Sequence, residues 1–170
     1  IIEFFTILAI CHTVLAEYAD IDNNPHRVEY KAQSPDEAAL VAAARDVGFV
    51  FLGREQYHDN TEHSSASPKT ALSCEFLGQP QKFILLNVLE FTSARKRMSV
   101  IVRRPEDNKI FMFTKGADNV IIERLRVSQD SGAVDSETWK QQRELKEKTL
   151  EDLETFATNG FRTLCLAYRV

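Results

Sequence analysis

Four strand-like segments separated by short turns constrain the fold of this chain more than any other feature. They cover residues 71–77, 82–90, 97–103 and 109–114. The chain turns at residues 78–80 and 105–108, where glycine, proline and asparagine favour a reversal. Strands joined by connections this short pair with opposite directions, because a parallel pair needs a longer crossover. The segment therefore predicts an antiparallel meander.

Helices and further strands are expected on both sides of this meander. We predict helices at 1–17, 34–48, 117–125 and 136–158, and strands at 28–33, 49–52 and 162–170. The first segment is shorter than the ~20 apolar residues of a spanning helix and carries Glu3 and His12, so we expect a core helix. This order predicts an α+β fold with a mostly antiparallel twisted sheet flanked by helices, in a single domain over residues 1–170.

The stretch SPDEAALVAAARDVG carries the clearest local signal of a helix. Ser34 fits the N-cap, Pro35 the first helical position and Gly48 the C-terminal cap. Glu37 stands three residues after Ser34, which predicts a capping box between their side chains and backbones. In that interpretation Asp36 and Glu37 are helix-start carboxylates rather than a catalytic pair.

Composition and charge exclude several classes of function. The 170 residues carry a net charge of −4, which argues against a general polyanion binder. The three cysteines form no C-x-x-C pair, so we expect reduced, mostly buried thiols and neither a zinc site nor a redox dithiol. The four histidines are scattered, and residues 19–27 and 58–69 are polar loops. No G-x-S-x-G, H-E-x-x-H or P-loop motif is present.

Two stretches have the residues of a binding site. Phe91 ends a strand beside small polar residues, where its ring can stack on a base. In FTKGAD, Lys115 supplies charge, Gly116 leaves room for a ligand near the backbone, and the following helix start offers N–H groups. Strand alternation predicts that Lys96 faces inward with Met98.

By the same alternation Arg95 and Arg97 point outward. Arg162 has two open interpretations, a surface pair with the acidic helix before it or a phosphate or ribose contact. Three functions therefore remain at this point: a site for a phosphate-bearing small molecule, a nucleic-acid module that uses Phe91 and the RKR run, and a ligand-free interaction domain.

The motifs SPDEAAL, FTSARKRMSV, FTKGAD and GFRTLCLAYR, in this order, resemble the nucleotide-binding domain of P-type ATPases, and their detailed form resembles the phospholipid-flipping type IV branch. The resemblance covers essentially the whole chain. It implies that Phe91 stacks on adenine, that Glu37 lies near the adenine amino group and that Arg162 reaches the ribose or phosphates. The remaining ATP-binding residues that it implies are Ser93, Lys96, Lys115, Gly116 and Ala117.

The resemblance also implies a larger parent protein. The chain has no DKTGT motif, whose aspartate accepts the phosphoryl group in this family, so we expect it to bind ATP with Mg²⁺ without hydrolysing it. The implied parent is a phospholipid-translocating ATPase of the plasma membrane, Golgi or endosomes. Its phosphorylation and actuator domains and an accessory subunit are the implied partners, with no nucleic acid. The domain itself is expected to be soluble on the cytosolic face, excised from this larger transporter.

Overall fold

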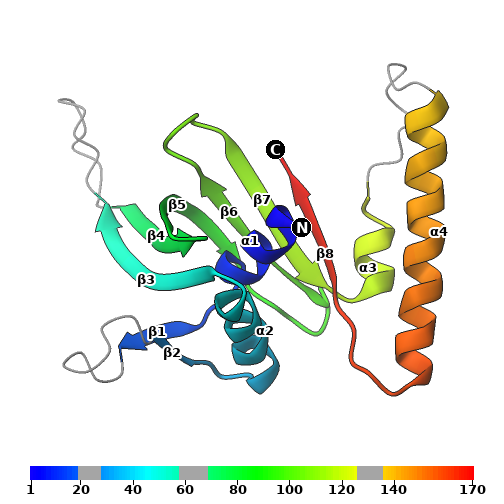
Figure 1. The fold of residues 1–170 in the computed structure, drawn as a ribbon, viewed down its shortest axis with the longest axis horizontal. Coiled ribbons are helices and arrows are strands. Elements are labelled where there is room, and N and C mark those ends of the chain that lie inside the picture. Colours follow the sequence, from blue (N-terminus) through cyan, green and yellow to red (C-terminus); the bar gives the residue numbers. More distant parts are fainter. Residues whose placement is uncertain (19–27, 58–68, 126–135) are drawn as a thin grey trace.

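The computed structural model describes residues 1–18, 28–57, 69–125 and 136–170. The predicted polar loop at 19–27 lies outside these residues, and so does the loop predicted at 58–69 except for Lys69, which begins a strand. Within them the chain forms these elements (Figure 1): α1 (Ile2–Ile10), β1 (Leu15–Tyr18), β2 (Val28–Lys31), α2 (Pro35–Asp46), β3 (Phe49–Tyr57), β4 (Lys69–Phe76), β5 (Gln79–Leu89), β6 (Arg97–Arg103), β7 (Ile110–Gly116), α3 (Asp118–Ile122), α4 (Ser136–Thr158) and β8 (Cys165–Arg169).

A six-stranded sheet forms the centre of the molecule (Figure 1). Its strands lie in the order β3-β4-β5-β6-β7-β8, and every neighbouring pair is antiparallel. The predicted α+β class and the meander from β4 to β7 are therefore confirmed. β8 returns to the sheet after two helices and pairs with β7, so that Cys165 lies opposite Gly116.

The strand after α2 is longer than the sequence predicts. We expected it to end at residue 52, but β3 continues to Tyr57 through a β-bulge. Phe51 pairs with Cys74 and Gly53 with Ser73, so Leu52 is the extra residue. Gly53 has φ 143°, a backbone conformation that side chains disfavour. The bulge explains why the alternation of β3 was hard to recognise in the sequence.

The predicted helix over residues 1–17 is too long. α1 ends at Ile10, and Leu15 begins β1, which pairs with β2 in a separate two-stranded ribbon. Leu15 is 61% exposed, so its helical spacing from the apolar residues of α1 was coincidental. The β-branched pair Thr13 and Val14 is a poor continuation of a helix.

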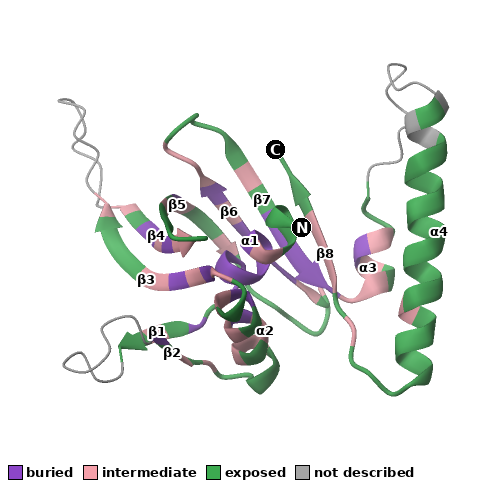
Figure 2. Ribbon diagram, in the orientation of Figure 1, coloured by how far each residue is buried: buried purple, intermediate pink, exposed green. Residues whose placement is uncertain are grey.

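Helices α1 and α2 pack on one face of the sheet and enclose the main core (Figures 1 and 2). Residues 7–10 of α1 are buried, which confirms the predicted core helix. Val41 and Ala44 of α2 join them against side chains from β3, β4, β6 and β7. This packing fixes the start of α2 near the end of α1, because the two helices share one layer.

Helices α3 and α4 lie beside β8 (Figure 1). α4 has the predicted bounds, and the chain leaves it through Gly160 with φ 78°, as its predicted C-cap requires. Cys11, Cys74 and Cys165 are free thiols, and the first two are buried. Within the described ranges, no helix is long and apolar enough to cross a membrane.

Candidate functional site

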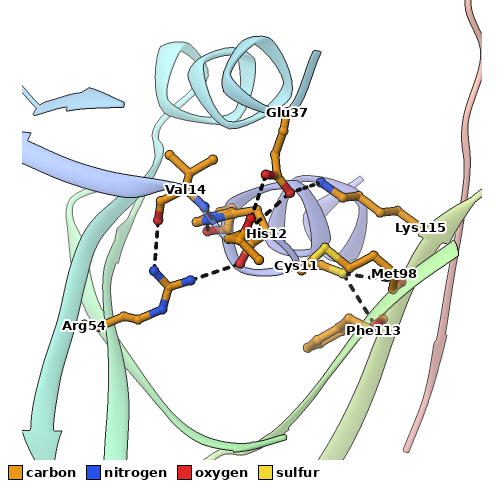
Figure 3. Close-up of polar contacts among 10 residues, drawn as sticks. Cys11, His12, Val14, Glu37, Arg54, Met98, Phe113 and Lys115 are labelled. Carbon is orange, nitrogen blue, oxygen red and sulfur yellow. Dashed lines mark hydrogen bonds and ion pairs between the residues drawn. The ribbon is translucent and has the colours of Figure 1, made fainter. Parts of the chain in front are cut away.

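Glu37 and Lys115, which are 78 residues apart in the sequence, meet between α2 and the end of β7 (Figure 3). The Lys115 ammonium lies 3.3 Å from Glu37 Oε1, and the two side chains are 9% and 14% exposed. Lys115 lies opposite Met98 of β6, whose side chain belongs to the core under α1. A nearly buried lysine therefore reaches out of the sheet to a carboxylate at the start of a helix.

Thr13 completes the environment of the Glu37 carboxylate. Its backbone N–H donates to Glu37 Oε1 at 3.3 Å, and its hydroxyl donates to Oε2 at 3.0 Å. Burial opposes ionisation of Glu37, but the charge of Lys115 and the hydrogen bonds from Thr13 and Lys115 outweigh it and lower the pKa of the carboxyl. Glu37 is therefore an ionised carboxylate, and each of its two oxygens accepts a hydrogen bond.

The predicted capping box at the start of α2 is wrong. Ser34 takes the N-cap position with extended backbone and Pro35 the first turn, but no side chain caps the helix. Glu37 turns to Thr13 and Lys115 instead of back to the Ser34 N–H. A buried ammonium attracts the carboxylate more strongly than an exposed amide does, so the tertiary contact prevails over the local motif.

Gly116 and Ala117 lie against the start of β6. A Cβ on Gly116 would lie 2.5 Å from Arg97 Cβ and 2.6 Å from the Lys96 carbonyl oxygen. The Ala117 N–H donates to that same oxygen at 3.0 Å. The expectation that Gly116 leaves space for a ligand is corrected on this side, because the chain's own backbone fills the space and the glycine permits close approach of β6.

The N–H groups expected to be free at the helix after Gly116 are also engaged. α3 is a short helix, and the Asn119 N–H donates to Asp118 Oδ1 at 2.7 Å. The Val120 N–H donates to Asn119 Oδ1 at 2.9 Å. These two N–H groups are thus bonded within the chain, and Lys115 is the stronger candidate for an anion contact.

The predicted alternation of the RKR run is wrong. β6 begins at Arg97, and Lys96 precedes it in a left-handed turn conformation with φ 49° and an exposed side chain. Strand alternation does not extend into a turn, so Lys96 does not share the inward face of Met98. The Arg95 guanidinium donates to the carbonyls of Leu89 and Glu90, and that of Arg97 donates to Arg95 O. The hydrogen bonds of these two arginines thus stabilise the loop that carries them.

Phe91 and Ser93 lie in the loop between β5 and β6, and both are exposed. The Phe91 ring is 61% exposed. The Lys96 N–H donates to Thr92 O at 2.8 Å, which closes the loop. The Lys96 carbonyl oxygen in turn accepts a hydrogen bond from the Ala117 N–H. The loop that carries Phe91 is thus joined to the end of β7, beside Lys115.

Among the residues that the structure describes, Arg162 pairs with α2 and not with the preceding acidic helix. Its guanidinium lies 2.6 Å from Asp36 Oδ2, and the two side chains are 85% and 50% exposed. Asp36 is the neighbour of Glu37, so this contact brings Arg162 to the same end of the sheet. Such an exposed pair is weak and leaves the arginine available to a competing anion.

Sequence reasoning missed two residues that support this site, Thr13 and Arg54. Arg54 donates to the carbonyls of His12 and Val14 at 3.0 and 2.9 Å, in the turn that carries Thr13 (Figure 3). No motif contains either residue. In the part of the chain that the structure describes, no three histidine, cysteine or acidic side chains gather into a metal-binding cluster. His26, His58 and His63 lie outside that part.

Comparison with known proteins assigns the chain to a family. A family model described as "P-type ATPase, cytoplasmic domain N" matches residues 1–170. The chain is 45% identical over 167 residues to phospholipid-transporting ATPase dnf2 of Schizosaccharomyces pombe, covering 98% of this chain and 10% of that protein. It is 45% identical to probable phospholipid-transporting ATPase 11 of Arabidopsis thaliana over 168 residues, covering 98% of this chain and 12% of that protein.

A human relative gives the same result. Phospholipid-transporting ATPase ID of Homo sapiens is 41% identical over 167 residues, again across 98% of this chain and 11% of the relative. The chain thus spans about a tenth of the length of the curated relatives that it matches.

Proposed function

This chain belongs to the cytoplasmic N domain family of P-type ATPases, and from that premise we propose that it binds ATP at the sheet end that carries Phe91, Glu37 and Lys115. The observation that carries the proposal is the exposed Phe91 ring, on a loop whose last residue bonds to Ala117 beside the buried Lys115–Glu37 pair. An exposed ring on a loop that is bonded to the strand end with the ammonium and the carboxylate offers the stacking and polar contacts that a purine nucleotide can use.

In this site the residues have different tasks. Phe91 stacks on the adenine ring, and Glu37 accepts a hydrogen bond from its amino group. Lys115 supplies positive charge at the pocket wall, while Ser93, Lys96, Gly116 and Ala117 line it. Arg162 leaves its exposed partner Asp36 for the ribose or phosphates, because the two groups are held only by a weak surface contact. Mg²⁺ arrives with the nucleotide phosphates.

The proposed parent reaction rests on the relatives. Their names describe phospholipid-transporting ATPases, and we propose that the protein containing this chain moves phospholipids across a membrane with energy from ATP. The chain lacks the DKTGT aspartate. Its task is therefore to hold ATP and present the γ-phosphate to that aspartate in a phosphorylation domain, which is catalysis by positioning. An accessory subunit and a location in the plasma membrane, Golgi or endosomes belong to the same proposal.

The nucleic-acid alternative gains no support from the structure. Arg95 and Arg97 donate to backbone carbonyls of their own loop. They do not form an exposed row with Lys96 along which a phosphate backbone could lie.

An ATP titration of the chain, followed through backbone amide shifts, tests the proposed function. We expect the shifts to cluster at residues 91–96, 115–117, Glu37 and Arg162, with a dissociation constant of about 0.3–1 mM. ATP should not be hydrolysed, and single-stranded DNA should leave the same amides unmoved. Unmoved amides at saturating ATP would refute the proposal.

Phe91→Ala provides the second test. Because the ring is exposed, its removal should weaken ATP binding by about 1–3 kcal/mol, the energy of a base stack, and leave the thermal midpoint unchanged. Phe156→Ala is the matched control, because Phe156 is 50% exposed and lies on α4, which carries none of the residues assigned to the site. Equal affinities for the two variants would show that Phe91 does not stack on the nucleotide.

A further inference from the structure

One residue between α1 and β1, Thr13, contacts both oxygens of the Glu37 carboxylate. Both donors of Thr13, the backbone N–H and the hydroxyl, bind the two oxygens of Glu37 separately, at 3.3 and 3.0 Å. A carboxylate held at both oxygens by one residue has a defined plane as well as a defined position. Oε1 then also meets Lys115 Nζ at 3.3 Å. The geometry of the ion pair thus depends on where Thr13 lies.

Thr13 lies in a turn that hydrogen bonds of its own residues hold in place. Cys11 is the C-cap of α1, and its N–H donates to Ile7 O at 2.8 Å. The His12 ring, 1% exposed, bonds Ala9 O through Nε2 at 2.8 Å and accepts from the Val14 N–H at Nδ1 at 3.2 Å. Since Nδ1 accepts, the proton of the neutral ring is on Nε2. Burial lowers the pKa of His12 to about 4, so this arrangement persists at neutral pH.

Arg54 links the same turn to the sheet through hydrogen bonds. Its guanidinium donates to His12 O and Val14 O, the carbonyls on either side of Thr13 (Figure 3). It also lies over the Phe51 ring, 5.5 Å from the ring centroid. The bulge makes this possible. Because Leu52 is an extra residue, Arg54 pairs with Leu72 and shares the face of Phe51 and Cys74, toward α1. In a regular strand Arg54 would face the other way.

We propose that Thr13, held in place by Arg54, is a positioning residue of the nucleotide site, which orients the Glu37 carboxylate and through it the Lys115 ammonium. The inference rests on the proposed function, because it assigns these residues to the same ATP site. Thr13 does not touch the nucleotide; it acts through Glu37. The competing role is purely structural, a tie between the α1 turn and α2 with no effect on nucleotide affinity.

The variant Thr13→Val tests the inference. Valine has the shape of threonine and keeps the backbone N–H, so only the bond to Glu37 Oε2 is lost. We expect ATP affinity, measured by amide shifts in the presence of Mg²⁺, to fall about 3- to 10-fold. The Glu37 pKa, followed through its carboxyl carbon resonance, should rise because a stabilising hydrogen bond is removed. Thr13→Ser restores the hydroxyl and should restore both values.

A matched control and a second variant keep the test decisive. Thr149→Val makes the same substitution on α4, where the hydroxyl donates to Leu145 O of the same helix, and should change neither value. Arg54→Met loosens the turn without touching Thr13, and should lower ATP affinity and raise the Glu37 pKa in the same direction. It also serves if Thr13→Val fails to fold.

The outcomes separate this inference from the function on which it rests. If the wild-type chain binds ATP and folded Thr13→Val binds it equally well, the positioning role is overturned and the proposed function stands. If the wild-type chain does not bind ATP, both are overturned. Weaker binding by Thr13→Val that Thr13→Ser fails to restore would also overturn the inference, because the hydroxyl would not be its cause.

Discussion

At the scale of single residues, Lys115 is the clearest case of a charge that the fold has to satisfy. Its side chain is 9% exposed, and its partner in the structure is Glu37. A buried ammonium without a counter-charge is costly, and so is the carboxylate that its removal leaves behind. Lys115 therefore has a structural task as well as its proposed place in the nucleotide pocket.

Lys115→Ala should consequently destabilise the domain as well as weaken ATP binding. We expect the free energy of unfolding, from urea denaturation, to fall by about 1–3 kcal/mol, less than for a fully buried pair because Glu37 keeps its bonds to Thr13. Lys109→Ala removes an exposed pair with Asp107 at 3.5 Å and should cost less than about 0.5 kcal/mol. Equal stabilities for the two variants would contradict the role of the buried pair.

His12 makes the stability of the domain depend on pH. Burial lowers its folded pKa to about 4, from 6.5. Between these values the unfolded chain binds more protons than the folded one, so acid favours unfolding. We expect the free energy of unfolding to fall by about 2 kcal/mol between pH 7 and pH 5.

The range from pH 7 to pH 5 distinguishes the contribution of His12 to stability from that of the carboxylates. The lowered pKa of Glu37 contributes stability that is present above 4.5 and is lost at lower pH. Urea denaturation at the two pH values gives the stability change, and the His12 ring resonances give its pKa. A His12 ring that titrates near 6.5 in the folded chain would contradict this prediction.

At the scale of elements, the contact between β6 and β7 explains Gly116. The strands are so close at the Arg97–Gly116 pair that a Cβ would meet backbone and Cβ atoms at 2.5–2.6 Å. Backbone atoms cannot move aside as a flexible side chain does. The glycine is therefore a requirement of the sheet before it is a feature of any ligand site.

Gly116→Ala should separate the ends of β6 and β7. We expect a loss of about 1–3 kcal/mol or more from overpacking, with amide shift changes at Lys96 and Ala117, whose hydrogen bond spans the contact. Gly160→Ala is the control, because a Cβ there meets nothing within 4 Å and only its φ of 78° is unfavourable. The prediction fails if Gly116→Ala is the milder of the two in thermal denaturation.

At the scale of the whole molecule, α4 stands apart from the packed core (Figure 2). Its apolar side chains Leu145, Leu150 and Phe156 are 69%, 43% and 50% exposed. A cavity of about 670 Å³ lies between α4, α3 and β8, and most of its lining is apolar. Exposed i,i+4 ion pairs such as Lys140–Glu144 stabilise the helix by only a few tenths of a kcal/mol each.

The rate of amide hydrogen exchange should therefore differ between α4 and the packed core. We expect amides in the middle of α4 to exchange through local opening, much faster than those of β6 or of α2, whose Val41 and Ala44 are buried. Exchange measured by NMR in the native chain gives the protection of each amide. Equal protection of α4 and β6 would mean that the helix opens only with the whole domain.

The sequence by itself determined most of the elements, because their signals are local. Turn residues between apolar runs predicted the meander, Pro35 and Gly48 delimited α2, and the four motifs indicated the family. Each of these features depends on residues that are close together along the chain. The end of α1 was missed because His12 and Arg54 stabilise the turn through contacts that no local pattern records.

The tertiary structure alone decided which side chains meet. Glu37 fits a capping box locally, yet it binds Thr13 and Lys115, which are 24 and 78 residues away. Arg54 reaches the turn because one extra residue in β3 reverses its face. A contact between residues so far apart in the sequence forms only when the strand register, the bulge and the helix end are all in place. A small change in any of these turns a side chain in another direction.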